Sequence, residues 1–264
     1  MRSMDDRRAE FERMANRRTI GELLITRERP GKAFELCNSM AATKRTDQAT
    51  LYMGVDMDDP CRKEYLQLAA AFDFAIMVNI PAQGEFPGAP YLWNTVARYA
   101  IAEGCDILHL LGDDVRYISE GWDEIVLREF ALAEPDGFLF LYGPDGNHRG
   151  PGRDNATHPW INASYVDAVG EYVKTGFPVD GLDTWQFEVF DGVGRTRYND
   201  DLRIDHLQWR RGRCEPDHVT TERMRWKENK QVTRKLWVEM EGERKADVKR
   251  VKKHIERIRH ENQS

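Results

Sequence analysis

Short apolar runs alternate with segments of helical periodicity through the first half of the chain. The strand-like runs are residues 19–26 (TIGELLIT), 49–56 (ATLYMGVD), 72–79 (FDFAIMVN), 105–111 (CDILHLL) and 138–143 (FLFLYG). The helical patterns between them are a segment after RERPG with Phe34, Cys37, Met40 and Ala41 on one face, residues 88–104, and a helix capped by Ser119 whose apolar side is Trp122, Ile125, Val126 and Phe130. This alternation predicts an α/β fold, a Rossmann-like and mostly parallel sheet flanked by helices.

The second half of the chain has a weaker pattern. Residues 143–159 are rich in Gly, Pro, Asn and Asp and predict a long loop. Helical patterns follow at 164–174 and 182–192, and 197–209 resembles a strand that leads to His206. We therefore expect three parts: a charged N-terminal helix or arm over 1–18, one α/β domain over 19–214, and a charged helical extension over 215–264.

Polar residues end three of the predicted strands. They are Thr26, Arg27 and Arg29 after the first, Asp56 and Asp58 after the second, and Asp113 and Asp114 after the fourth. Because the carboxyl ends of parallel strands share one edge of a sheet, and ligands bind beyond that edge, we expect these residues to form one site. Each of these residues can also be interpreted as a solvated turn residue. Their occurrence at the ends of three strands on the same edge favours a functional site.

Metal and phosphate chemistry fits these residue types. Adjacent carboxylates at Asp113 and Asp114 repel each other unless a cation lies between them, and His206 is a candidate third ligand. An imidazole beside carboxylates favours Mn²⁺ over Mg²⁺. Arg27 and Arg29 offer guanidinium forks for a diphosphate. Asp56 and Asp58 are candidates for the base or ribose of a nucleotide, and Asn94, on the helix facing this edge, is a further candidate ligand.

Candidate groups for catalysis and for a second substrate come from later in the chain. Asp183 opens a helical segment, where it is either a helix cap or a general base that takes a proton from an acceptor hydroxyl. Trp122, His158 and Trp160 are candidates for an acceptor site, because sugars stack on aromatic faces. For Trp122 the competing interpretation is core packing, since it falls on an apolar helix face.

Composition narrows the class of protein. The 264 residues carry a net charge of −6, with 41% hydrophobic residues, which excludes a disordered chain. Residues 215–264 carry a net charge of +4, so the rest of the chain is strongly acidic. Electrostatic binding of nucleic acid by the whole chain is therefore not expected. No apolar run approaches a membrane span, the start is not a signal peptide, and the four cysteines form no CxxC pair. A cytoplasmic protein with reduced thiols is expected.

Over about residues 19–210 the sequence resembles a GT-A fold glycosyltransferase. The segments that carry the resemblance are LLITRERPG, LYMGVDMDDP, DILHLLGDDVRYISEGWDE and DHLQW. Their pattern is most similar to that of small family-two-like enzymes of bacteriophages and bacteria. The resemblance implies transfer of a sugar from a nucleotide sugar, with a UDP-sugar favoured, to a glycan, a protein or a hydroxymethylated DNA base. It places Thr26, Arg27 and Arg29 near the diphosphate, Asp56 at the base, Asp113 and Asp114 in the metal-binding DxD region, Asp183 at the catalytic carboxylate and His206 at the metal.

Two departures from the family pattern leave alternatives open. The motif is Gly-Asp-Asp rather than Asp-x-Asp, so either Asp113 or Asp114 aligns with the metal ligand, and Leu182 replaces the acid that usually precedes the position of Asp183. A nucleotidyltransferase on a similar sheet is one alternative, although the loop TRERPGK lacks the expected glycines. A non-catalytic nucleotide- or nucleic-acid-binding protein with the same fold is the other.

Overall fold

The computed structural model describes residues 18–81, 88–133, 136–148, 150–153, 156–177, 180–219 and 227–261. The predicted arm at 1–18 therefore lies, except for Arg18, outside the described residues. The strands are β1 (Ile20–Ile25), β2 (Ala49–Asp56), β3 (Ala75–Ile80), β4 (Ile107–Leu111), β5 (Val115–Tyr117), β6 (Phe140–Tyr142), β7 (Trp160–Asn162), β8 (Thr196–Tyr198) and β9 (Ile204–His206). The helices are α2 (Pro30–Thr43), α3 (Arg62–Ala71), α4 (Ala89–Ala102), α5 (Trp122–Ala131), α6 (Ser164–Val169), α7 (Leu182–Asp191), the 3-10 turn η2 (Trp209–Arg211), α9 (Lys227–Glu239) and α10 (Glu241–Glu261).

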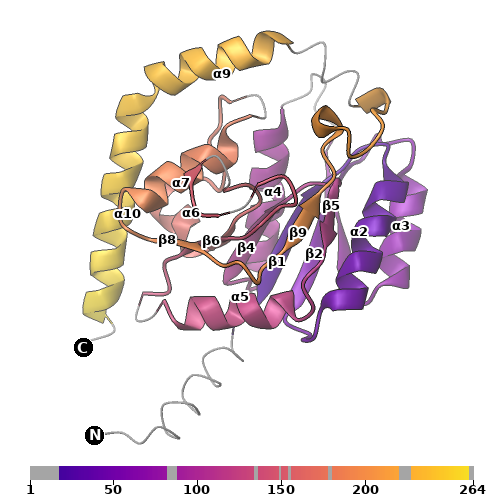
Figure 1. The fold of residues 1–264 in the computed structure, drawn as a ribbon, viewed down its shortest axis with the longest axis horizontal. Coiled ribbons are helices and arrows are strands. Elements are labelled where there is room, and N and C mark those ends of the chain that lie inside the picture. The colour runs from indigo at the N-terminus through magenta and orange to yellow at the C-terminus, as the bar shows by residue number, and fades with distance from the viewer. Residues whose placement is uncertain are drawn as a thin grey trace, which may run out of the picture.

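A seven-stranded sheet forms the centre of the molecule, with strand order β3-β2-β1-β4-β7-β6-β8 (Figure 1). Strands β3, β2, β1 and β4 run parallel, β7 is antiparallel to both its neighbours, and β8 is parallel to β6. The predicted α/β class and mostly parallel sheet are confirmed. The strand order reverses between β1 and β4, and in open α/β sheets this switch point is where ligands bind.

Helices cover both faces of the sheet and enclose two apolar cores. One core joins the sheet to α2, α3 and α5, and the other joins it to α4, α6, α7 and α10. Helix α10 runs along the side of the molecule next to α6 and α7 (Figure 1), and its Val251 and Ile255 are buried in the second core. The end of the chain is thus packed onto the α/β layer through ordinary apolar burial.

The local predictions hold for most elements and fail in details that depend on packing. On α2 the predicted Cys37 and Met40 are buried, together with Ala33 and Leu36, whereas Phe34 and Ala41 are exposed, so the predicted face is correct at two of its four positions. Ser119 does not cap α5, because Gly121, in the left-handed region at φ 68°, holds that position. The Ser119 hydroxyl instead accepts a hydrogen bond from the backbone N–H of Arg203.

A second sheet consists of two strands, β5 and β9. It places β9 beside the strand that directly follows Asp113 and Asp114. Its antiparallel register sets Val115 opposite His206. The predicted single strand over 197–209 is therefore two strands in two different sheets. This small sheet carries His206 to the residues that follow β4.

Candidate functional site

The ends of β1 and β4 meet at the switch point and bring Thr26, Arg29 and Asp113 together. The Thr26 hydroxyl donates to Asp113 Oδ2 at 3.2 Å, and Arg29 Nη1 donates to Asp113 Oδ1 at 3.0 Å. Burial alone would lower the pKa of Arg29, but the nearby carboxylates of Asp113 and Asp217 raise it above its ordinary value. A buried, permanently charged guanidinium therefore lies at the place where the fold binds ligands.

Lys32 and Asp217 complete this part of the site. The carboxylate of Asp217 lies 2.5 Å from Arg29 Nη2 and 3.0 Å from Lys32 Nζ, so it bridges two cations. A cavity of about 200 Å³ adjoins them. Its lining residues are Lys32, Glu35, Asp113, Asp114, Val115, Arg116, Leu207 and Cys214. Arg29 and Lys32 together form an anion-binding pair beside the acidic turn.

Arg27, Asp56 and Asp58 form a separate cluster at the end of β2. Arg27 Nη1 donates to Asp58 Oδ1 at 2.8 Å and to Asp56 Oδ2 at 3.1 Å. The hydrogen bond from Arg27 lowers the pKa of exposed Asp58, whereas burial raises the pKa of Asp56. The single charge of Arg27 is thus shared between two carboxylates, and Asp56 is the more buried of the two.

Asp114 faces His206, whereas Asp113 faces β1. His206 Nε2 lies 3.4 Å from Asp114 Oδ2, and His206 Nδ1 lies 3.8 Å from Asp145 Oδ2. Burial opposes the imidazolium, but hydrogen bonding to Asp114 and Asp145 outweighs burial and raises the pKa of His206 to about 9. Of the two alignments left open by the sequence, this geometry favours Asp114 as the partner of His206.

Asp145, which follows β6, lies beside the Nδ1 atom of His206. It is fully buried and accepts hydrogen bonds from the backbone N–H groups of Asn147 and His148 and from the Thr157 hydroxyl. These bonds and that of His206 hold the pKa of Asp145 well below its ordinary range, although burial alone would raise it. A fixed carboxylate behind an imidazole is a common arrangement at ligand-binding histidines.

His158 packs against His206, with ring centroids 4.5 Å apart and the rings nearly perpendicular. Burial, together with the charge of His206, lowers the pKa of His158 to about 3, so its imidazole is neutral near pH 7. Its backbone is in the left-handed region, at φ 49°, which is uncommon for a residue other than glycine. This His158 ring therefore belongs to the same cluster as Asp114 and His206.

Asp183 lies in the first turn of α7, close enough to His206 for the imidazolium charge to affect it. Burial raises the pKa of Asp183, while hydrogen bonds from Thr184 and the charge of His206 lower it, with a net increase. The backbone N–H of Thr184 donates to Asp183 Oδ1 at 2.7 Å. A buried carboxyl with a raised pKa suits a general base.

Three predicted ligands are used for structure instead. Trp122 and Trp160 are 0% and 1% exposed, and Trp160 stacks on His109 at 3.7 Å, so neither reaches an acceptor. Asn94 accepts from the backbone N–H groups of Tyr172 and Val173 and donates to the Val173 carbonyl. The assignments of these three residues are therefore corrected: aromatic bulk fills the core, and the Asn94 amide fastens a loop to α4.

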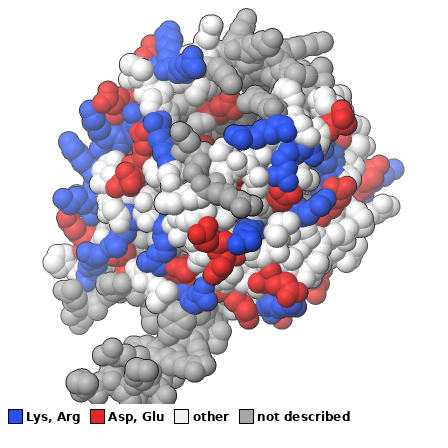
Figure 2. All heavy atoms as spheres, in the orientation of Figure 1, with Lys and Arg blue, Asp and Glu red and all other residues white. Residues whose placement is uncertain are grey.

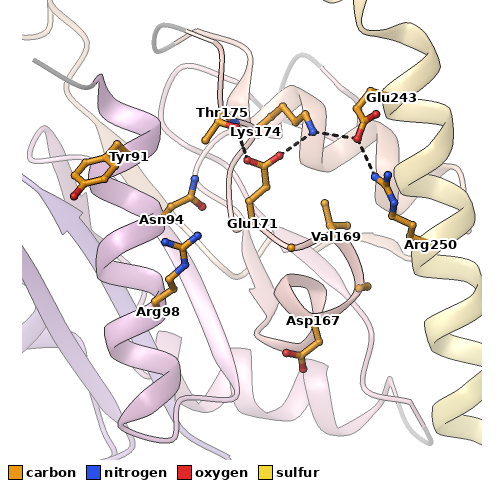
Figure 3. A pocket seen from close by; sticks show the side chains of 12 residues that line it. Tyr91, Asn94, Arg98, Asp167, Val169, Glu171, Lys174, Thr175, Glu243 and Arg250 are labelled. Atoms are coloured by element: carbon orange, nitrogen blue, oxygen red, sulfur yellow. Dashed lines mark hydrogen bonds and ion pairs between the residues drawn. The ribbon is translucent and has the colours of Figure 1, made fainter.

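Asn94 also lines a cavity of about 590 Å³ between α4, the loop after α6 and α10 (Figure 3). Figure 3 shows Lys174 between Glu171 and Glu243, with Arg250 beyond them. These four charged side chains of its lining are thus already paired with one another. This cavity lies apart from the cluster at the switch point, and we assign no role to it.

The donor set at the switch point suits a divalent cation that also binds phosphate. Among the described residues, no three His, Cys, Asp or Glu side chains already converge around one metal position. Asp114 Oδ2 and His206 Nε2 offer two ligands of the types that Mn²⁺ accepts, and phosphate oxygens and water commonly supply the others. The residues present fit such an ion, and Asp113 pairs with Arg29.

Comparisons with known proteins support the fold. No protein-family model matches the chain, and no curated protein sequence matches it. Among solved structures, TarS residues 1–349 of S. aureus matches with a TM-score of 0.54 and 10% identity, over 70% of this chain and 59% of that one. The mannosyltransferase PcManGT of Pyrobaculum calidifontis, in complex with GDP-Man and Mn²⁺, matches with a TM-score of 0.56 and 11% identity, over 74% and 58%.

The chain therefore has the GT-A fold of these glycosyltransferases, and the resemblance seen in the sequence is confirmed at the level of the fold. It spans less than two thirds of the length of either structure. The structure of TarS residues 1–349 in complex with UDP matches similarly, with a TM-score of 0.56. In the part of the chain that the structure describes, no helix has the length and apolarity to cross a bilayer.

Sequence reasoning missed Lys32, Asp145 and Asp217. Lys32 follows Arg29 by one helical turn, so the motif TRERPGK already contained both cations of the anion-binding pair. Asp145 stands in a Gly- and Pro-rich turn that marks a loop but no function. Asp217 lies 188 residues from Arg29, and no local pattern signals that contact.

Proposed function

We propose that this chain is a metal-dependent glycosyltransferase that moves a sugar from a nucleotide sugar, with a UDP-sugar favoured, to an acceptor hydroxyl. The observation that carries the proposal is the meeting of Arg29, Asp113, Asp114 and His206 at the switch point of a GT-A fold. The similar structures support it, since TarS residues 1–349 binds UDP and UDP-GlcNAc and PcManGT binds GDP-Man with Mn²⁺.

Each residue of the site has a role that follows from its chemistry. Arg29 and Lys32 bind the diphosphate through charge-assisted hydrogen bonds, in the place that the Asp217 carboxylate holds. Asp56 accepts hydrogen bonds from the base or ribose. Asp114 and His206 would hold Mn²⁺, or Mg²⁺, which would supply positive charge that stabilises the leaving diphosphate.

Asp183 acts on the acceptor. Its carboxylate takes the proton of the acceptor hydroxyl as that oxygen bonds to the anomeric carbon and the nucleoside diphosphate leaves. The raised pKa of Asp183 brings this base closer to the working pH than an ordinary carboxylate would be. A nucleotidyltransferase would release pyrophosphate instead of a nucleoside diphosphate, so analysis of the leaving group separates the two activities.

A thermal-unfolding panel with UDP, GDP, CDP and ADP, each with Mn²⁺ or with EDTA, tests donor binding. One nucleotide, expected to be UDP, should raise the Tm by roughly 5–10 °C when present at about 100 times its Kd with Mn²⁺. The increase should be lost with EDTA, and in Asp114→Asn and His206→Gln. The absence of any nucleotide-dependent increase would contradict the proposed function, whereas a positive result directs a screen of glycan, protein and hydroxymethylated DNA acceptors.

The Asp217→Asn variant is expected to bind the nucleotide about threefold to tenfold more tightly. The reason is that Asp217 neutralises Arg29 and Lys32, and a diphosphate must displace it. Isothermal titration with UDP and Mn²⁺ measures the change. Asp47→Asn is the matched control, because Asp47 also pairs with a lysine but is fully exposed on the surface. An unchanged Kd in Asp217→Asn would show that the diphosphate binds elsewhere.

The charge distribution bears on a DNA acceptor. Figure 2 shows basic and acidic side chains intermixed over the described surface in that view, with no broad area of one sign. Binding to the phosphate backbone depends on several converging Lys and Arg side chains, so this face offers no such track. We therefore place glycan and protein acceptors ahead of modified DNA.

A further inference from the structure

Tyr65 lies on α3, and its hydroxyl joins two residues of the candidate site. The Tyr65 side chain is fully buried. The backbone N–H of Arg29 donates to the Tyr65 hydroxyl oxygen at 2.8 Å, and the Thr26 hydroxyl oxygen lies 3.0 Å from the same atom. One phenol oxygen therefore contacts both ends of the turn that follows β1.

The direction of each of these hydrogen bonds follows from the groups that it joins. A backbone N–H only donates, so the Tyr65 oxygen accepts from Arg29 and has its own proton to donate to Thr26. A carboxylate only accepts, so the Thr26 hydroxyl donates to Asp113 Oδ2, at 3.2 Å, and accepts from Tyr65. A continuous chain of hydrogen bonds thus runs from the Arg29 backbone through Tyr65 and Thr26 to Asp113.

The chain of hydrogen bonds closes into a ring through the Arg29 side chain. Arg29 Nη1 donates to Asp113 Oδ1 at 3.0 Å, so both carboxylate oxygens of Asp113 are bound within the ring. Arg29 is fixed twice, at its backbone by Tyr65 and at its guanidinium by the carboxylate that Thr26 orients. Because connected hydrogen bonds in a buried setting strengthen one another, loss of the Tyr65 hydroxyl loosens the whole ring.

The backbone of this turn is strained and is held by the region around α3. Glu28 has φ 56°, in the left-handed region that residues other than glycine rarely adopt. Its backbone N–H donates to Asp59 Oδ2 at 3.0 Å, and the other Asp59 oxygen accepts from the N–H of Cys61, directly before α3. The consecutive N–H groups of Glu28 and Arg29 are therefore both bound by buried side chains, Asp59 and Tyr65. Strained backbone persists where its surroundings fix it in this way, and it is concentrated at ligand-binding sites.

We propose that Tyr65 is a positioning residue of the anion-binding pair, whose hydroxyl holds Thr26 and Arg29 so that the guanidinium is in place before the donor diphosphate arrives. A side chain that is already ordered loses less conformational entropy on binding, so the diphosphate is bound more tightly. Tyr65 acts through Arg29 and touches no substrate. The inference rests on the proposed function, because it deepens the role given there to Arg29.

The Tyr65→Phe variant keeps the buried ring and removes only the hydroxyl. We expect its Kd for UDP with Mn²⁺, measured by isothermal titration, to rise about fivefold to thirtyfold, because a buried N–H loses its partner and Arg29 loses its support. The Kd for uridine, measured by competition with UDP, should stay within about twofold of wild type, since uridine has no phosphate for Arg29 to bind. A change that only loosened the fold would weaken both ligands alike.

Tyr52→Phe is the matched control for this experiment. Tyr52 is also buried, and its hydroxyl accepts from Cys105 Sγ at 3.4 Å. Cys105 lies beside Gly21, at the end of β1 opposite to Thr26. Loss of this hydroxyl should therefore leave the Kd for UDP within about twofold of wild type.

A double-mutant cycle shows whether Tyr65 acts through Arg29. In an Arg29→Ala background, Tyr65→Phe should change the Kd for UDP by less than about twofold, because the side chain that it positions is gone. An unchanged Kd in a folded Tyr65→Phe variant overturns the proposal, as does an equal loss of affinity in the two backgrounds. If Tyr65→Phe does not fold, Thr26→Val breaks the ring at its next member, and the same outcomes apply to it. In each case, Mn²⁺-dependent binding of UDP by wild type leaves the proposed function standing, whereas a wild type that binds no nucleotide removes both.

Discussion

Replacing Glu22 with alanine is expected to destabilise the fold by about 3–5 kcal/mol, because it leaves a buried imidazole and two buried donors without their partner. Glu22 is 0% exposed in the middle of β1, and its Oε1 accepts from Trp160 Nε1 at 3.0 Å. His109 and Tyr117 contact the other oxygen. Three strands and the small second sheet thus depend on a single carboxylate.

Urea unfolding followed by tryptophan fluorescence measures this change, with Glu35→Ala as the control. Glu35 is exposed on α2, where alanine is a good helix former, so its replacement should alter stability by less than about 0.5 kcal/mol. Glu22→Gln should lie between the two, because an amide oxygen still accepts from Trp160 while the charge is gone. A loss below about 1 kcal/mol in Glu22→Ala would contradict the structural role of this network.

Replacing Asp183 with asparagine is expected to lower kcat for sugar transfer by about 10²–10⁴-fold, the usual contribution of a general base. Binding of UDP and Mn²⁺ should remain within about twofold of wild type, since the anion-binding pair and the metal ligands are untouched. In wild type, the rate should fall as the pH drops through the raised pKa of Asp183, because protonation removes the base. This acidic limb should disappear in Asp183→Asn.

Asp191→Asn is the matched control for this experiment. It changes an aspartate of the same helix, but at the far end, about 12 Å along the axis, where the side chain is exposed. Asp180→Asn tests a second carboxylate, whose charge acts on Asp183. If Asp180→Asn abolishes transfer and Asp183→Asn does not, the base is Asp180 and the assignment made here is wrong.

The amino-acid sequence by itself determined most strands and helices of the N-terminal half, although it did not predict α3. The run ATLYMGVD became β2 over the same residues, and residues 88–104 became α4 with its Pro near the start. Such elements follow from local periodicity and from Pro and Gly signals, which act within a few residues. The gathering of Thr26 and Asp113 at one edge was also predictable, because parallel strands bring their carboxyl ends together.

Only the tertiary structure decided which polar residues face one another. It directed Asp113 to Arg29 and Asp114 to His206, buried Trp122 and Trp160 in the core, and used Asn94 to fasten a loop. It also divided residues 197–209 between two sheets, and brought Asp217 to Arg29 and His158 to His206. These contacts join residues separated by up to 188 positions, and no periodicity spans such a distance, because packing of whole layers sets them.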